Sequence, residues 1–255
     1  MGMHGSWLWY ELMTRDADAA MRFYGPLLGW RAQPIDGGYV LITNADGGMT
    51  GGLLPLTETM AANGAVPAWL GYIGVDDVDA FVARAAADGA SVLMPPADVA
   101  MAGRIALIAD PCGAPVYVMT PNGEGTSTAF GLTQPGRCAW NELCVGDPAR
   151  ALAFFTAHFG WDAPPPMDMG PMGQYHFIAH EGVSNGGVVA LSEGMGAPHW
   201  NHYFRVADID RAAVQVGELG GRVVNGPHPI AGGDAIIHLF DPEGAFACLV
   251  GARAA

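Results

Sequence analysis

An internal duplication with a constant spacing of 131 residues constrains this chain more than any other feature of its sequence. Residues 9–12 read W-Y-E-L, and residues 140–143 read W-N-E-L. The same spacing relates Phe23 to Phe154, Trp30 to Trp161, Trp69 to Trp200, Val75 to Val206, Gly89 to Gly220 and Asp110 to Asp241. Self-similarity at a fixed spacing is typical of a repeated structural unit. We therefore predict two similar halves within 255 residues, a length that suits two domains.

Each half is itself double. A strand followed by a helix is expected over residues 7–28, and the same order returns over residues 69–88. Further strands complete each unit, which predicts four βαβββ modules and an α+β fold. We expect residues 1–122 to form the first domain and residues 136–255 the second, with two modules in each. Residues 123–135 contain Gly, Ser, Thr and Pro and form the predicted linker.

Local signals predict where helices and strands begin and end. Aspartates stand where helix N-caps belong and glycines where helices stop; these are Asp16, Asp147, the aspartates around Asp76, Asp208, Gly89 and Gly220. Strands are predicted at residues 39–43, 105–109, 116–119, 175–179, 236–240 and 247–250. The Asn185-Gly186 pair is typical of a hairpin turn. That interpretation excludes a nucleophile elbow at the G-x-S-x-G match of residues 182–186, because the elbow requires a helix after it.

Composition excludes several classes of partner. The formal net charge is −14, and only 11 Lys and Arg are spread along the chain, so no basic patch could neutralise nucleic acid or an anionic membrane. No apolar run reaches the roughly 18 residues that span a bilayer, and the N-terminus lacks a secretory signal pattern. The four cysteines have no C-x-x-C spacing. We expect a cytoplasmic protein with free thiols that contacts neither nucleic acid nor membrane.

Several motifs of this chain occur together in a known superfamily: W-x-E-L, Phe23-Tyr24, Gly29-Trp30, Gly103-Arg104 and Asp110-Pro111. Their combination over both halves resembles the glyoxalase, bleomycin-resistance and extradiol-dioxygenase group, also called the vicinal oxygen chelate superfamily, and within it the two-domain glyoxalase-like branch. The resemblance implies two glyoxalase-like domains, each with a curled mixed sheet that forms an open half-barrel and with helices on the outside. It implies no single activity, because the superfamily includes lyases, dioxygenases and inert drug-binding proteins.

The resemblance also indicates where metal-using members place their ligands. These positions are on the first strand of a module, the first strand of its partner and the last strands, and they fall here on Trp9, Leu70, Tyr117, Trp140, Asn201 and Cys248. A divalent ion in such a site needs His nitrogens and a carboxylate oxygen. This chain has neither at those positions. We therefore predict no metal and no other cofactor in either half.

Other side chains on the same strand faces could form pockets. Because alternate residues of a strand point to one face, Glu11 accompanies Trp9, Glu142 accompanies Trp140, and Tyr72 and Tyr203 accompany Leu70 and Asn201. Glu11 and Glu142 are the predicted catalytic residues, as general acids or bases; the alternative is that each only accepts backbone or indole hydrogen bonds. The predicted ligand-binding residues are Trp9, Tyr72, Arg104, Tyr117, Trp140, Asn201, Tyr203 and Cys248. Arg104 would pair with an anion, or else be a solvated charge at a strand end.

The histidines leave a second interpretation open. All except His4 lie in the C-terminal half. A divalent metal bound at a displaced site would use Glu142, His238 and either His176 or His202. Under this alternative the protein would be a metal-dependent lyase or dioxygenase.

The leading hypothesis is a glyoxalase-like protein that binds a small aromatic or carbonyl-bearing metabolite in metal-free pockets. Lyase or isomerase chemistry by proton transfer would accompany binding if the protein is an enzyme. The alternative from another class is a non-catalytic sequestration protein of the antibiotic-binding type. Because one chain carries four modules, both a monomer and a homodimer fit the sequence.

Overall fold

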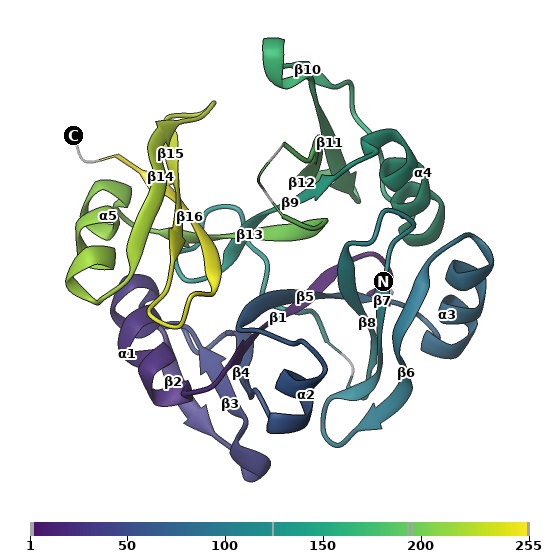
Figure 1. Cartoon of the computed structure of the whole chain (residues 1–255), viewed down its shortest axis with the longest axis horizontal. Helices are drawn as coiled ribbons and strands as arrows, with labels where there is room; N and C mark the ends of the chain where they lie inside the picture. The colour runs from purple at the N-terminus through teal and green to yellow at the C-terminus, as the bar shows by residue number, and fades with distance from the viewer. Residues whose placement is uncertain (1–2, 124, 193, 195, 254–255) are drawn as a thin grey trace. The chain divides into compact units, whose positions relative to one another are not determined.

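The computed structural model describes residues 3–123, 125–192, 194 and 196–253. Its strands form two eight-stranded mixed sheets with the same order of elements, β2-β3-β4-β1-β5-β8-β7-β6 and β10-β11-β12-β9-β13-β16-β15-β14. Neither order closes on itself, so neither sheet is a closed barrel. The predicted α+β fold with open mixed sheets is confirmed (Figure 1).

The first half of the chain contains the elements β1 Trp7–Thr14, α1 Ala17–Leu28, β2 Arg31–Pro34, η1 Asp36–Gly38, β3 Val40–Thr43, β4 Met49–Pro55, α2 Glu58–Ala62, β5 Ala68–Gly74, α3 Val78–Ala87, β6 Ser91–Val99, β7 Gly103–Ala109 and β8 Pro115–Pro121. The second half contains β9 Cys138–Val145, α4 Pro148–Phe159, β10 Met167–Asp168, η2 Gly170–Met172, β11 Gln174–His180, β12 Val183–Ala190, β13 His199–Val206, α5 Ile209–Glu218, β14 Arg222–Pro229, β15 Asp234–Phe240 and β16 Phe246–Ala252. The short helix α2 is the one described α-helix that the sequence patterns did not predict.

The four βαβββ modules share one pairing rule. In each module the first strand runs parallel to the last: β1 with β4, β5 with β8, β9 with β12 and β13 with β16. The remaining strands of a module follow as antiparallel neighbours. A parallel pair needs a crossover connection, which the helix after each first strand supplies. The repeated sequence is therefore a repeated supersecondary unit.

Helix starts follow the predicted aspartates. Asp16 and Asp147 cap α1 and α4, Asp208 caps α5, and Asp77 is the cap of α3 among the aspartates around Asp76. Each carboxylate accepts a hydrogen bond of 2.8–3.1 Å from the backbone N–H three residues on. Such a cap stabilises a helix by about 1 kcal/mol. Every cap lies two or three residues beyond the last residue of the first strand of its module, so the turn from strand to helix is short in all four modules.

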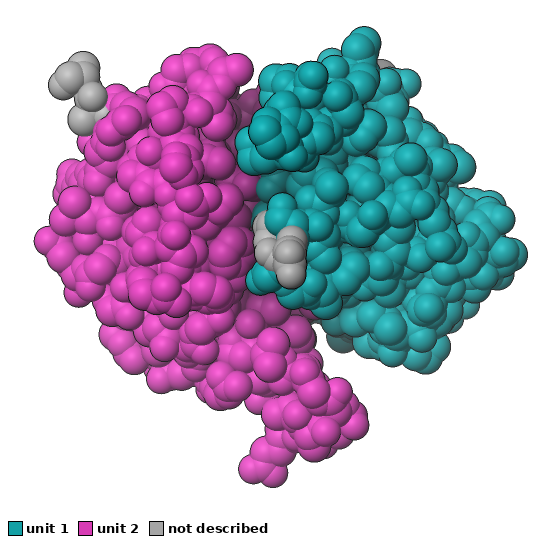
Figure 2. Space-filling model, turned by 45° about the horizontal axis from the view of Figure 1, so that its top comes forward, with its two compact units in different colours: residues 1–8, 71–127, 140–201 teal, residues 9–70, 128–139, 202–255 magenta. Residues whose placement is uncertain are grey.

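The chain divides into two compact units (Figure 2). Unit 1 comprises the described residues of 1–8, 71–127 and 140–201, and unit 2 those of 9–70, 128–139 and 202–255. Each unit thus takes residues from both halves of the sequence. The domain bounds expected from the repeat, 1–122 and 136–255, stay a prediction. Within the described chain, no helix is both long and apolar enough to span a bilayer.

Each unit has an aromatic core. In unit 2 the ring of Phe204 packs on Trp69 at 4.7 Å and on Trp30 at 5.2 Å, and Tyr24 meets Trp69 edge-on at 5.4 Å. In unit 1 Phe155 packs in the same way on Trp200 at 5.2 Å. Edge-to-face and offset ring pairs of this kind add about 0.5–1.5 kcal/mol each beyond area burial. Trp69 and Trp200 are therefore core residues.

Candidate functional site

In unit 2, strand β1 presents a Trp and a Glu that are joined by a tyrosine. Alternation along β1 puts Trp9 and Glu11 on one face. The indole Nε1 of Trp9 donates to the hydroxyl of Tyr39 at 2.9 Å, and that hydroxyl donates to Oε2 of Glu11 at 2.9 Å. Glu11 is only 4% exposed, whereas Trp9 and Tyr39 are half-buried. Tyr39 therefore holds Oε2 of this buried carboxylate, and the indole of Trp9 holds Tyr39.

Unit 1 contains the same arrangement on β9. Nε1 of Trp140 donates to the hydroxyl of Tyr175 at 2.6 Å, and Tyr175 is hydrogen-bonded to Glu142. Burial, followed by the negative charge of Glu142, raises the pKa of Tyr175 far above its usual value. Tyr175 therefore keeps its proton and acts as a donor toward the carboxylate. Trp140 and Glu142 are half-buried, so this carboxylate is more accessible than Glu11. We call each set of three residues a Trp-Tyr-Glu relay.

Glycines make room for both tyrosines. A Cβ atom on Gly52 of β4 would lie 2.2 Å from the hydroxyl oxygen of Tyr39, and one on Gly187 of β12 would lie 2.2 Å from Cε1 of Tyr175. Real Cβ atoms do not approach other atoms so closely, so only glycine permits the ring to lie against the strand. Each relay therefore depends on three elements of its module: the first strand, which carries the Trp and the Glu; the fourth strand, which carries the glycine; and the strand or loop that carries the tyrosine.

The neighbouring glycine of β12 corrects one sequence prediction. The hairpin turn expected at Asn185-Gly186 is wrong, because both residues lie inside β12 and the chain turns at Glu181-Gly182, where φ is positive at both residues. A Cβ on Gly186 would lie 2.0 Å from the backbone oxygen of Asn141. The glycine is needed for close approach of two parallel strands and not for a turn. A strand follows residues 182–186, so the structure contains no nucleophile elbow there.

Asn201 of β13 extends the relay of unit 1. Its Nδ2 donates to Oε1 of Glu142 at 3.2 Å and lies 3.5 Å from Sγ of Cys144. Asn201 is 2% exposed, and its buried Oδ1 has no hydrogen-bond partner in the part of the chain that the structure describes. Burial, and then the charge of Glu142, raises the pKa of the Cys144 thiol, which stays protonated. At the equivalent positions of the first half the chain has Leu70 and Met13.

The other predicted ligand-binding residues form two separate pairs. In unit 1 the rings of Tyr72 and Tyr117 stack at 4.2 Å with an interplanar angle of 8°. In unit 2 the hydroxyl of Tyr203 lies 3.0 Å from Nε2 of His238. From His238 the hydrogen bonds continue to Asn225 and then to the exposed His228. Cys248, directly opposite both Tyr203 and His238 in the sheet, is fully buried.

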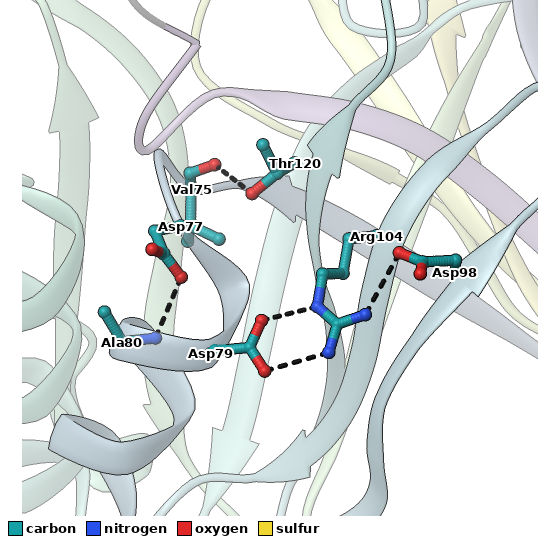
Figure 3. A network of polar contacts seen from close by, with 7 residues as sticks. All are labelled: Val75, Asp77, Asp79, Ala80, Asp98, Arg104 and Thr120. Atoms are coloured by element: carbon teal, nitrogen blue, oxygen red, sulfur yellow. Dashed lines mark hydrogen bonds and ion pairs between the residues drawn. The ribbon is translucent and has the colours of Figure 1, made fainter.

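Arg104 is already neutralised (Figure 3). Its guanidinium binds both carboxylate oxygens of Asp79 on α3, and its Nη1 donates to Asp98 of β6 at 3.0 Å. The Arg104 guanidinium lowers the pKa of Asp79 below its usual value. Figure 3 shows the guanidinium between the two carboxylates. An anionic ligand would have to displace the carboxylates of Asp79 and Asp98. The predicted role of Arg104 in anion binding therefore receives no support from this geometry.

The residues at the expected metal positions do not fit a metal. Trp9, Leu70 and Tyr117 supply no imidazole or carboxylate, and neither do Trp140, Asn201 and Cys248. Among the residues that the structure describes, no group of three His, Cys, Asp or Glu side chains is arranged to hold an ion.

Of the alternative ligand set, His202 packs against the ring of Tyr10 at 5.0 Å, and burial lowers its pKa to about 3. It is a neutral core residue. The other members, Glu142, His176 and His238, are half-buried.

Two relay residues were missed from the sequence. Tyr39 and Tyr175 are 136 residues apart, not 131, so the repeat does not align them. A longer connection between α4 and β11 than between α1 and β3 causes the difference. The usable signal was the Gly-Gly pair of each half, at residues 51–52 and 186–187, because paired glycines inside a strand indicate close approach of another group.

Comparison with known proteins places the chain in a family. The family model described as "Glyoxalase/Bleomycin resistance protein/Dioxygenase superfamily" matches residues 7–118 and 136–249. The chain is 34% identical to "Putative glyoxylase CFP32" of Mycobacterium bovis over 93% of this chain and 91% of that protein. It is 31% identical to "Anthracycline biosynthesis protein DnrV" of Streptomyces peucetius over 94% and 91%.

Among solved structures, the Mn(II)-bound glyoxalase from Novosphingobium aromaticivorans shares the fold with a TM-score of 0.69 at 17% identity, covering 100% of this chain and 84% of that one. The 2,2',3-trihydroxybiphenyl 1,2-dioxygenase from Sphingomonas wittichii has a TM-score of 0.66 at 17% identity, with 96% and 90% covered. The repeated modules agree with the matches over both halves: the chain belongs to the glyoxalase/bleomycin resistance protein/dioxygenase superfamily.

Proposed function

We propose that this protein binds a small aromatic or carbonyl-bearing metabolite at its Trp-Tyr-Glu relays, without a metal, and that Glu142 transfers a proton during turnover. The observation that carries the proposal is the relay itself, built twice on equivalent strands. In each copy a carboxylate is held by a tyrosine hydroxyl, which an indole N–H holds in turn. The repeat aligns the Trp and the Glu of the two relays but not Tyr39 and Tyr175, and recurrence of the tyrosine contact despite this offset favours a shared role for the set.

The chemistry of the relay suits a planar ligand. A half-buried indole offers an aromatic face, which stacks well on aromatic or conjugated carbonyl groups. A carboxylate next to it can remove a proton from a carbon beside a carbonyl. Return of the proton at a neighbouring position is an isomerase step, and loss of a leaving group from the carbon next to the resulting carbanion is a lyase step. Tyr175 orients the carboxylate throughout. Glu142 is the better base of the two glutamates because it is half-buried, whereas Glu11 is almost fully enclosed.

The names of the relatives guide the choice of probes. A relative is named for anthracycline biosynthesis and another as a glyoxylase. Aromatic polyketides such as hydroxyanthraquinones and small α-dicarbonyls are therefore the two ligand classes to test first. Hydroxyanthraquinones test binding alone, because no C–H adjoins their ring carbonyls, whereas an α-dicarbonyl with a C–H next to a carbonyl also offers a proton that Glu142 can remove.

The test is a binding and turnover experiment on protein treated with a chelator. Titration followed by tryptophan fluorescence should show saturable binding of one probe class. Glu142→Gln should retain binding and lose turnover, because glutamine keeps the shape and removes the base. Glu218→Gln, an exposed position at the end of α5, is the matched control and should change neither. Binding that appears only after Fe, Mn, Ni or Zn is added would overturn the metal-free proposal.

Sequestration is the second candidate function. The enclosure of Glu11, which is 4% exposed, favours a binding role over a catalytic one for the relay of unit 2. A protein of this class would bind one equivalent of probe per occupied relay and release it unchanged. Product analysis by mass spectrometry after prolonged incubation separates the two candidates, since only an enzyme converts an excess of probe.

A further inference from the structure

The amide of Asn201 presents an unused hydrogen-bond acceptor beside Glu142. Its side chain is 2% exposed, and among the described residues no group donates to its Oδ1. Leaving a buried acceptor without a donor is costly, and native structures rarely do so without a reason. The missing donor therefore has to come from outside the described residues.

The contacts of the amide nitrogen of Asn201 determine how the amide is oriented and that its oxygen is the free atom. Nδ2 donates to Oε1 of Glu142 at 3.2 Å and faces Sγ of Cys144 at 3.5 Å. If the amide were turned over, its carbonyl oxygen would lie against the carboxylate, where it would lose a donor and meet a like partial charge. The carbonyl is therefore the end that remains available.

The acceptor is specific to one half of the chain. The positions equivalent to Asn201 and Cys144 are Leu70 and Met13, so both polar groups are replaced together by apolar ones. Leu70 is buried in unit 2, the unit that contains the Glu11 relay. Besides the greater exposure of Glu142, the two relays thus differ in a second respect: the unit 1 relay has an extra acceptor, whereas the equivalent position of the first half is apolar.

We propose that Asn201 determines specificity at the unit 1 relay by accepting a hydrogen bond from a ligand hydroxyl, so that this relay takes hydroxylated aromatic or hydroxycarbonyl compounds. The inference rests on the proposed function and adds the substrate class. A site built around a buried acceptor rejects an analogue that cannot donate to it, because the acceptor is then desolvated and unpaired. The relay of unit 2 lacks this requirement and does not discriminate.

The test compares two probes that differ only in the donor. These are a hydroxyanthraquinone whose hydroxyl lies away from the ring carbonyls, and its methyl ether, in a mildly acidic buffer that keeps the phenol protonated. In a two-site analysis of the titrations, the site that Asn201→Leu alters should bind the hydroxyl compound at least about 10-fold more tightly than the ether in the wild-type protein. Asn201→Leu, which installs the residue found in the other half, should bind the ether as before and lose the preference. Asn122→Leu, an exposed amide, is the matched control.

A second variant separates Asn201 from Glu142. Glu142→Ala removes the carboxylate without adding a donor, so it should keep the preference for the hydroxyl compound because the Asn201 acceptor remains. If Asn201→Leu keeps the preference, or if the wild type binds both probes equally well, Oδ1 is satisfied by something other than the ligand and the inference is overturned. If the wild type binds neither probe nor any dicarbonyl, the proposed function fails as well, so the two failures are distinct.

Discussion

The hydroxyl of Tyr24 donates a hydrogen bond of 3.1 Å to Oδ2 of Asp241, the aspartate that closes the turn between β15 and β16. The same hydroxyl accepts from Nε1 of Trp69 at 3.1 Å. Burial raises the pKa of Tyr24 well above its usual value, so the phenol stays protonated and can donate. One hydroxyl therefore satisfies two buried groups from elements far apart in the sequence of unit 2.

Unit 1 lacks this hydroxyl. The 131-residue spacing aligns Phe155 with Tyr24. The ring of Phe155 meets Trp200 edge-on, as the ring of Tyr24 meets Trp69. Among the described residues, Nε1 of Trp200 and Oδ2 of Asp110 have no hydrogen-bond partner. Burial also raises the pKa of Asp110. In the described part of unit 1, these two polar atoms thus lack the hydrogen bonds that the hydroxyl of Tyr24 makes at the equivalent place in unit 2.

Phe155→Tyr should therefore stabilise the protein. Its hydroxyl would serve Trp200 and Asp110 together, and we expect a gain of about 1–2 kcal/mol in the free energy of unfolding. Tyr24→Phe should lose a similar amount, because it removes the existing bridge. Urea denaturation of both variants checks the prediction. Equal or lower stability of Phe155→Tyr would show that the two atoms are satisfied by buried water instead.

Gly187→Ala should destabilise the protein and disturb the relay of unit 1. The added methyl would lie 2.2 Å from the ring of Tyr175, so the ring has to move away from Glu142. Overpacking of this kind costs about 1–3 kcal/mol. Gly217→Ala is the matched control, because a Cβ there meets nothing within 4 Å and alanine favours the helix. Adding Tyr175→Ala to Gly187→Ala should recover part of the lost stability, since the clash is gone; full additivity would contradict the argument.

The sequence predicts the modules well because each depends on local chemistry. Asp caps, turn aspartates and alternating strands act within a few residues, and the repeat supplies every signal twice. The relays were only half predictable. Alternation on β1 identified Trp9 and Glu11, but Tyr39 reaches Glu11 from a loop before β3, and loops of unequal length broke the repeat alignment. Likewise, Gly186 signals a turn by composition, whereas the structure uses it for strand contact.

Arg104 should not be required for ligand binding. Two carboxylates already neutralise its guanidinium, so an incoming anion would have to compete with Asp79 for both of its hydrogen bonds. We expect Arg104→Gln to bind a neutral probe and a carboxylated analogue with unchanged affinities. Titration of both probes checks this. A selective loss of affinity for the carboxylated probe would show that Arg104 exchanges its partners and binds an anion.

His202 should make stability depend on pH. Burial lowers its pKa from 6.5 to about 3, so between these values the unfolded chain binds a proton that the folded chain does not. The free energy of unfolding therefore falls as the pH decreases through this window, by up to about 1.4 kcal/mol per pH unit.

His202→Asn removes the titrating group and should flatten the pH profile between about pH 6.5 and 5, above the range where most carboxylates titrate. Urea denaturation across this interval measures the slope. His199→Asn, the same substitution at a half-buried imidazole of the same strand, is the variant for comparison. If both variants keep the wild-type slope, the loss of stability on acidification arises from groups other than His202, and the imidazole is hydrated in the folded protein.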